Sequence, residues 1–251
     1  MLRNLIKNGF NASKIKVIDP FVGSRIPVVD YIASAANLPS NYHPDIVFIA
    51  LKPQDSKDIL TEFFKEKRFS KNTVFVSIIA GKKINFYTSI FGKKMKLVRS
   101  MPNLAVIENQ GVVAYLAKNL SDFEIHDIKY IFSLFGEVVE LKSEKDFDNF
   151  TAIFGSGPAY IFYLQEIFLK ITSTLNLDEK ISCNLVKKLF LGSSILSHNS
   201  NLSFSDLKDS VTSKNGTTEA ALSILRKKNN LEKIFDKAIK SASKRSKELS
   251  K

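Results

Sequence analysis

Residues 45–51, DIVFIAL, form a nearly continuous apolar run that stops at Lys52 and Pro53. A run of this length is typical of a strand that is buried on both faces. Helical stretches such as 54–67 separate it from similar runs, and this alternation predicts a parallel sheet covered by helices. We therefore expect the doubly wound α/β class. The other runs of this kind are 15–19 (IKVID), 73–80 (TVFVSIIA), 96–100 (KLVRS) and 111–117 (GVVAYLA).

Turn-forming or polar residues follow the expected strands at the edge where a ligand would bind. In an open parallel sheet, ligands bind in a crevice outside the carboxyl ends of the strands. Each of these segments could be an ordinary turn, because Pro and Gly end strands in many loops. Four of them at one edge favour a binding crevice. They are Asp19-Pro20, Lys52-Pro53, Ala80-Gly81 and Met101-Pro102-Asn103.

From about residue 144 the pattern is helical only. Residues 147–175 are apolar at helical spacing, and 178–198, 217–228 and 231–249 are amphipathic. We therefore divide the chain into a sheet domain, residues 1–145, and an all-helical domain, residues 146–251. The helical half carries more apolar surface than one layer needs, which predicts a partner subunit. Its phenylalanines include Phe150, Phe154, Phe162 and Phe168.

Composition is that of a globular protein, with 251 residues, 44% hydrophobic and 25% charged. Cys183 is the only cysteine, which excludes an internal disulfide and fits a reducing, cytoplasmic setting. No apolar run approaches the roughly 18 residues of a membrane span, so we expect no membrane partner. The three histidines are isolated from other metal-ligand types, so we expect no metal site.

The net charge of +12 raises the question of nucleic acid. Lysines are spread along the whole chain, and the phenylalanines fall at core-like spacings instead of interleaving with basic patches. A nucleic-acid footprint would need a clustered basic face. We therefore expect no specific nucleic-acid partner.

Residues 211–220, VTSKNGTTEA, predict an anion-binding helix start. Thr217 and Thr218 precede an apolar-periodic run that ends in the cations 226–228, a pattern of hydroxyl caps followed by a basic last turn. Asn215 and Gly216 can take positive φ, which would gather backbone N–H groups around a small anion such as a carboxylate. The alternative is an ordinary capped surface helix.

Four stretches in this order together resemble the pyrroline-5-carboxylate reductase family: IALKPQ (49–54), VRSMPN (98–103), GSGPAY (155–160) and LKDSVTSKNGTTEAAL (207–222). The resemblance covers essentially the whole chain. It implies a Rossmann-like domain followed by a helical domain through which subunits dimerise, with dimers assembling further. It also implies reduction of 1-pyrroline-5-carboxylate to L-proline, the last step of proline biosynthesis, by hydride transfer from NADPH or NADH.

The family chemistry needs few protein groups, because the cofactor carries the hydride and the cyclic imine is basic enough to protonate. The protein must hold the substrate carboxylate and align the imine with the nicotinamide. By resemblance, Thr218 is the catalytic candidate, as hydrogen-bond partner or proton donor to the ring nitrogen. The implied substrate-binding residues are Val211, Thr212, Ser213, Asn215, Gly216, Thr217, Gly155, Ser156, Gly157 and Pro158.

The cofactor that the resemblance implies is NADPH, with NADH as the alternative. An acid such as Asp19 at the end of the second strand often favours NADH, whereas Ser24 and Arg25 could meet a 2′-phosphate. The bland alternatives are a solvated strand end for Lys52 and a Gly/Pro kink for residues 155–158. The implied cofactor-binding residues are Asp19, Ala50, Lys52, Pro53, Ala80, Gly81 and Asn103, the last near the nicotinamide.

The sequence departs from the family pattern in three places. Lys214-Asn215-Gly216 stands where Pro-Gly-Gly is usual, and Leu104-Ala105 where Thr-Pro is usual. Asn tolerates positive φ, so the first turn can survive. The opening, residues 1–20, resembles the back half of the first Rossmann helix and the second strand, and about 12–16 residues of the pattern are absent before it.

Without a first strand we expect a gap in the sheet, exposed strand edges and weakened cofactor binding. Two interpretations stay open: the true start lies upstream of Met1, or the chain is a non-catalytic or impaired remnant that still oligomerises. A related NADP-dependent reductase of another small acid is a further alternative.

Overall fold

The computed structural model describes residues 1–19, 25–39, 41–65 and 69–249, so Pro20 and Ser24 lie outside the described residues. The main sheet confirms the predicted α/β class and the runs at 45–51, 73–80, 96–100 and 111–117. The last strand of the sheet was not predicted from its short, half-polar sequence. In spatial order the strands are β3 (Ile46–Ile49), β4 (Val74–Ser77), β5 (Lys96–Pro102), β6 (Gly111–Lys118) and β7 (Gly136–Glu140).

Strand β6 runs antiparallel to β5, whereas the other neighbouring pairs of this sheet are parallel. The expectation of a wholly parallel sheet is wrong for this pair. Only a short connection containing a 3₁₀ turn, Leu104–Glu108, joins the two strands. A parallel crossover needs about a dozen residues or more, so this connection can only reverse the chain.

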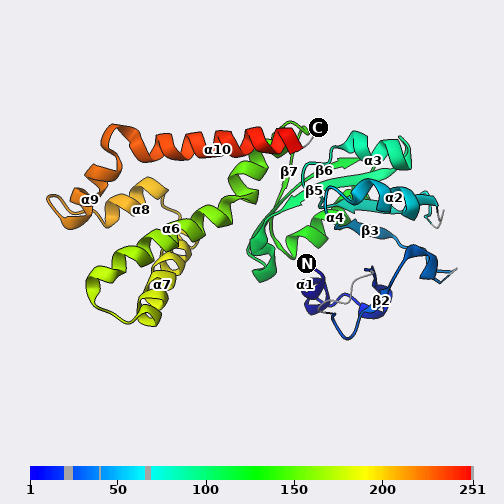
Figure 1. Cartoon of the computed structure of the whole chain (residues 1–251), viewed down its shortest axis with the longest axis horizontal. Coiled ribbons are helices and arrows are strands. Elements are labelled where there is room, and N and C mark those ends of the chain that lie inside the picture. Colours follow the sequence, from blue (N-terminus) through cyan, green and yellow to red (C-terminus); the bar gives the residue numbers. More distant parts are fainter. Residues whose placement is uncertain (20–24, 40, 66–68, 250–251) are drawn as a thin grey trace. The chain divides into compact units, whose positions relative to one another are not determined.

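Helices cover both faces of the main sheet, as predicted (Figure 1). On one face, α1 (Leu2–Lys7) and α4 (Asp122–Ser133) pack on a cluster that includes Val76, Tyr115 and Phe132. On the other, α2 (Ser56–Lys65) and α3 (Ile84–Phe91) pack on a cluster that includes Phe75 and Tyr87. Consecutive strand residues point to opposite faces, and neighbouring residues of β4 enter opposite clusters for that reason.

Strands β1 (Lys16–Ile18) and β2 (Asp30–Ile32) form a second, two-stranded parallel sheet. A salt bridge between Lys16 Nζ and Asp30 Oδ2, 2.5 Å long, joins their first residues. Within the described residues, β1 shares no ladder with β3. The predicted strand at 15–19 is therefore present, but it lies in a sheet of its own.

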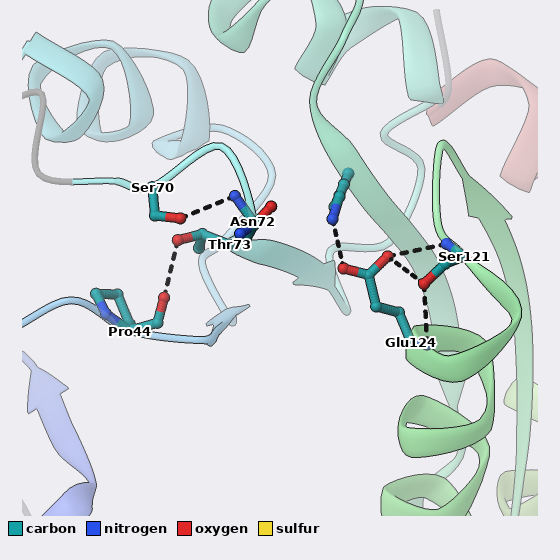
Figure 2. Close-up of polar contacts among 7 residues, drawn as sticks. Pro44, Ser70, Asn72, Thr73, Ser121 and Glu124 are labelled. Atoms are coloured by element: carbon teal, nitrogen blue, oxygen red, sulfur yellow. Dashed lines mark hydrogen bonds and ion pairs between the residues drawn. The ribbon is translucent and has the colours of Figure 1, made fainter.

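Polar contacts join the amino ends of β4 and β5 in the main sheet to neighbouring segments (Figure 2). Thr73, just before β4, donates its hydroxyl to the Pro44 carbonyl at 2.8 Å. Ser121 and Glu124 form a reciprocal capping box at the start of α4. The Glu124 carboxylate also pairs with Lys96 Nζ, at the first residue of β5, at 2.5 Å. These groups satisfy one another, so this edge offers little to a ligand.

The second half of the chain is helical, as predicted. Helix α5 (Asp146–Phe150) continues into a π-helical segment, Thr151–Gly155, and a 3₁₀ turn, Thr172–Leu175, follows α6. Helix α8 was not predicted. None of the helices in the described part of the chain has the length and hydropathy of a membrane span. The remaining helices are α6 (Gly157–Ile171), α7 (Glu179–His198), α8 (Phe204–Ser210), α9 (Thr217–Leu225) and α10 (Asn230–Leu249).

The chain packs as two compact units. The sheet unit comprises Met1–Ser156 together with Ala242–Lys251, and the helical unit comprises Gly157–Ser241. Helix α10 therefore begins in the helical unit and ends in the sheet unit. The division into 1–145 and 146–251 stays a prediction, since compact packing need not follow a domain boundary.

Candidate functional site

The carboxyl ends of β3 and β4 lie side by side at the edge opposite the one in Figure 2. Ile49 pairs with Ser77 in register, and the N–H of Ile78 donates to the Ile49 carbonyl at 3.1 Å. Ala50 and Ala80, which follow these ends closely, are small and exposed, so a flat ligand can reach the backbone there. Of the predicted cofactor residues, Ala50, Lys52 and Pro53 follow β3, and Ala80 and Gly81 follow β4.

A buried polar cluster fixes the end of β4 beneath this edge. The hydroxyls of Ser77 and Tyr87 hydrogen-bond at 2.5 Å, and Ser77 also accepts the Ile79 N–H at 3.2 Å. Ser100 on β5 donates to the Ser77 carbonyl at 3.0 Å. Burial raises the pKa of Tyr87 to about 12, so its phenol stays protonated at neutral pH. The backbone that leads to Ala80 is therefore firmly held.

Asp19 directly follows β1, and its N–H donates to the Ile32 carbonyl at 3.0 Å. It lies on the two-stranded sheet and not on the main sheet. Nearby in sequence, Arg25 lies over the Tyr31 ring, 5.3 Å from its centroid. Arg25 also lines a basic cavity of about 250 Å³, together with Arg3, Ile6, Lys7, Ile26 and Pro27.

Arg3 and Lys7 were missed as candidate residues. Their four-residue spacing places both on one face of α1, and this was the available signal. Only the fold brings that face to Arg25. Three cations therefore line this cavity, which is open to solvent and otherwise mainly apolar.

Asn103 joins two of the predicted motifs. Its side-chain carbonyl accepts the Val112 N–H at 3.2 Å, and its amide donates to the Phe154 carbonyl at 3.2 Å. A Cβ on Gly155 would lie 3.2 Å from Met101 Cε. The end of β5 and the π-helical segment are therefore in contact, and Met101 packs closely against Gly155.

The next three residues of this motif lie at the junction of the two units. Ser156 donates its N–H to the Thr151 carbonyl at 2.8 Å, the i to i−5 bond of a π-helix. Gly157 begins α6, and no described atom lies within 4 Å of the position that a Cβ would take there. Pro158 occupies the first turn, where no intrahelical N–H bond is lost. The π-helical segment is the observed irregularity, and such segments are frequent at functional sites.

The loop at 211–218 differs in detail from the predicted helix start. The N-cap of α9 is Gly216, and no side chain in the described chain caps this helix. Thr217 and Thr218 lie inside the first turn, so the predicted hydroxyl caps are wrong. The N–H groups of the first turn are therefore left for a ligand or water. Helix α9 also ends at Leu225, before the cations of 226–228, so the predicted basic last turn is wrong as well.

The backbone of this loop is shaped as predicted at one of two residues. Asn215 has φ of 59°, whereas Gly216 has φ of −85°. Gly216 is required for space instead, because a Cβ there would lie 2.3 Å from Ser213 Oγ. The remaining hydroxyl nearby, that of Thr212, donates to the Lys208 carbonyl at 2.7 Å.

Glu219 was missed as a residue of this loop. Its carboxylate accepts the Asn215 N–H at 2.5 Å and so folds back over the loop. A Glu three residues after the N-cap of α9 was the available signal. The Asn215 N–H is therefore already occupied by a carboxylate from within the chain.

Comparison with known proteins decides the family. The profile described as Pyrroline-5-carboxylate reductase dimerisation matches residues 144–249. Pyrroline-5-carboxylate reductase 1 of Bacillus subtilis (strain 168) is 32% identical over 207 residues, which cover 82% of this chain and 68% of that protein. The chain belongs to the pyrroline-5-carboxylate reductase family.

Solved structures of pyrroline-5-carboxylate reductases share this fold over most of their length. The Coxiella burnetii protein superposes with a TM-score of 0.87 at 27% identity, over 100% of this chain and 93% of that chain. The Plasmodium falciparum protein, solved with NADP bound, gives 0.85 at 25% identity, over 99% and 92%. The chain is therefore an oxidoreductase that uses a nicotinamide cofactor, and its dimerisation domain supports a homo-oligomer.

Proposed function

We propose that this chain reduces 1-pyrroline-5-carboxylate to L-proline with NADPH, and that residues 211–218 hold the substrate carboxylate. The start of α9 is the observation that supports this carboxylate site. Its first-turn N–H groups have no side-chain cap in the described chain. Backbone N–H groups at a helix start favour an anion through both hydrogen bonds and the helix dipole.

Thr218 is proposed to hydrogen-bond the ring nitrogen of the substrate. It lies in the first turn of α9 and is half-buried, whereas its neighbour Thr217 is exposed. A substrate whose carboxylate rests on the helix start brings its ring close to this hydroxyl. The protonated imine donates its N–H to Thr218 and keeps that proton when the C=N carbon receives a hydride. The remaining substrate-binding roles proposed are those of Val211, Thr212, Ser213, Thr217 and residues 155–158.

The residues present fit a dinucleotide at the carboxyl edge of the sheet. Small exposed residues leave the strand ends open, and Lys52 adds a cation. When bound there, the nicotinamide cofactor supplies the hydride. In this proposal Asn103, held by Val112 and Phe154, lies nearest the nicotinamide. Gly155 has no side chain, so Met101 approaches the backbone closely there.

NADPH is proposed over NADH because of the basic cavity. Arg3, Lys7 and Arg25 line it together, and a 2′-phosphate carries more charge than a ribose hydroxyl. The Arg25→Ala variant should lose NADPH efficiency by about tenfold while its NADH efficiency stays constant. Steady-state kinetics with both cofactors tests this, and equal losses would contradict the assignment.

A substrate without a carboxylate tests the loop assignment. We would compare NADPH oxidation by the purified chain with 1-pyrroline-5-carboxylate and with 1-pyrroline, which has the same ring and no carboxylate. Loss of the charged hydrogen bonds should lower kcat/KM at least about tenfold. Equal rates would contradict a carboxylate site, and turnover of neither compound would contradict the proposed reaction.

A further inference from the structure

The loop between β4 and α3, residues 78–83, is held by a carboxylate from a distant part of the sequence. Glu144 Oε1 accepts the N–H of Ile84 at 2.8 Å, across 60 residues of sequence. Ile84 is the first residue of α3, and its N-cap, Lys83, makes no side-chain cap hydrogen bond. Glu144 therefore does for α3 what an N-cap side chain does in other helices.

Arg99 on β5 fixes this carboxylate. Its Nη1 donates to the same oxygen, Glu144 Oε1, at 2.8 Å, and its side chain is only 6% exposed. The guanidinium also lies over the Phe147 ring, 4.2 Å from the centroid. A buried arginine is costly without a paired carboxylate, so the two residues hold each other in place. Arg99 is paired in register with Ser77, the last residue of β4.

The end of α10 covers the same loop. Gly81 has φ of +77°, and a Cβ there would lie 2.9 Å from the Leu249 carbonyl oxygen. This end of α10 is anchored to α5, because Ser246 Oγ donates to Asp148 at 2.7 Å and Ser243 Oγ to Asn149 at 2.7 Å. The loop is thus bounded by the chain segment after β7 on one side and by the C-terminal helix on another.

We propose that Glu144, oriented by Arg99, is a positioning residue for the nicotinamide cofactor. It fixes residues 78–83 so that Ala80 and Gly81 present their backbone at the carboxyl edge of the sheet. This inference rests on the proposed function, in which Ala80 and Gly81 contact the cofactor. Removal of the carboxylate frees the Ile84 N–H and leaves the charge of Arg99 buried and unpaired, so the loop loosens.

Two readouts on the full chain test this proposal. Amide hydrogen exchange over residues 78–86, measured without cofactor, reports on the loop, and NADPH fluorescence titration reports on affinity. In Glu144→Ala, the Ile84 amide should exchange faster and the NADPH Kd should rise about tenfold. Glu144→Gln should give intermediate values, because its amide oxygen can still accept from Ile84 and Arg99.

Glu140→Ala is the matched control. Glu140 also lies in a polar network, accepting from the Tyr115 hydroxyl at 2.7 Å and pairing with Lys129 at 3.2 Å, but it does not contact the loop. Both readouts should match the unmodified chain. Thermal unfolding of every variant identifies general destabilisation, and Glu144→Gln carries the test if Glu144→Ala does not fold.

The outcomes separate this proposal from the proposed function. Unchanged exchange at Ile84 in Glu144→Ala overturns the positioning role, and faster exchange with an unchanged NADPH Kd overturns its link to the cofactor. If the unmodified chain binds no NADPH, the proposed function fails, and the exchange at Ile84 alone decides whether Glu144 holds the loop.

Discussion

The two units of this reductase differ in where their apolar side chains lie. The sheet unit buries its own core on both faces of the sheet, with Val76, Phe132 and Tyr115 at 0% exposure. In the described helical unit, Val186 is the one apolar side chain that is buried. Large apolar residues there, such as Phe162 and Leu196, are more than half exposed. The sheet unit is therefore stabilised by its own packing, whereas the helical unit leaves an apolar surface that fits a partner subunit.

The largest effect is expected from the core of the sheet unit. Phe132→Ala removes a fully buried ring from the contact between α4 and the sheet, which should cost about 3–5 kcal/mol of unfolding free energy. Tyr130→Ala, two residues away on the exposed side of α4, should change stability by less than about 0.5 kcal/mol. Urea denaturation measures both. Similar losses in the two variants would show that α4 does not separate a core from a surface.

Association should depend on the apolar surface of the helical unit. Leu189→Asp on α7 puts a charge on a side chain that is 50% exposed in the single chain, and it should weaken association by about 100-fold, since a buried charge is costly. Phe123→Asp on α4 in the sheet unit is the matched control, because Phe123 is even more exposed. Sedimentation velocity over a concentration series distinguishes them. Dissociation by Phe123→Asp alone would place the interface on the sheet unit.

The separation of the substrate site from the cofactor site can be tested at Thr218. Thr218→Ala removes the side-chain hydroxyl and should lower kcat by about 10–100-fold, the contribution expected of one positioned hydrogen-bonding group. The NADPH Kd should stay unchanged. Thr217→Ala, at the exposed neighbour, should have a smaller effect on kcat. Stopped-flow turnover and fluorescence titration measure the two quantities. A parallel loss of turnover and NADPH affinity would mean that the loop is structural.

A small pH effect should come from the amino edge of the sheet. Desolvation raises the pKa of Glu124, but hydrogen bonds from Lys96 and Ser121 outweigh it and hold the pKa below its usual value. A lowered folded-state pKa adds stability above the unfolded value of about 4.3, and this stability is lost as the pH falls. Glu124→Gln should flatten the decline in stability between about pH 5 and 3, by no more than about 1 kcal/mol. Thermal unfolding across that range measures it, and parallel curves would contradict the role of the pair.

The sequence predicted those features that depend on local pattern. Apolar runs located β3, β4, β5 and β6, and the helical periodicity after residue 144 located α7 and α10. The antiparallel pairing of β6 was missed, because it depends on the length of one connection and not on strand composition. Strand β7 was missed because half of its residues are polar and its burial comes from neighbours.

Features of the site that depend on long-range contacts could not be predicted from local sequence either. The positive φ of Asn215 was foreseen from its residue type, but the cap of α9 depends on how Ser213 crowds Gly216. Glu144 and Arg99 are 45 residues apart, and no local pattern signals their contact. The basic cavity likewise needs α1 and residues 25–27 to meet in space. Groups that function through long-range contacts become visible only in the folded chain.

The most direct test of the proposed reaction follows the transferred hydride from the nicotinamide into the product. The purified chain would be incubated with 1-pyrroline-5-carboxylate and NADPH that carries deuterium at the transferable position of the nicotinamide, and the product analysed by mass spectrometry and NMR. We expect L-proline with one deuterium on the carbon of the former C=N bond. No proline, or proline without deuterium at that carbon, would contradict it.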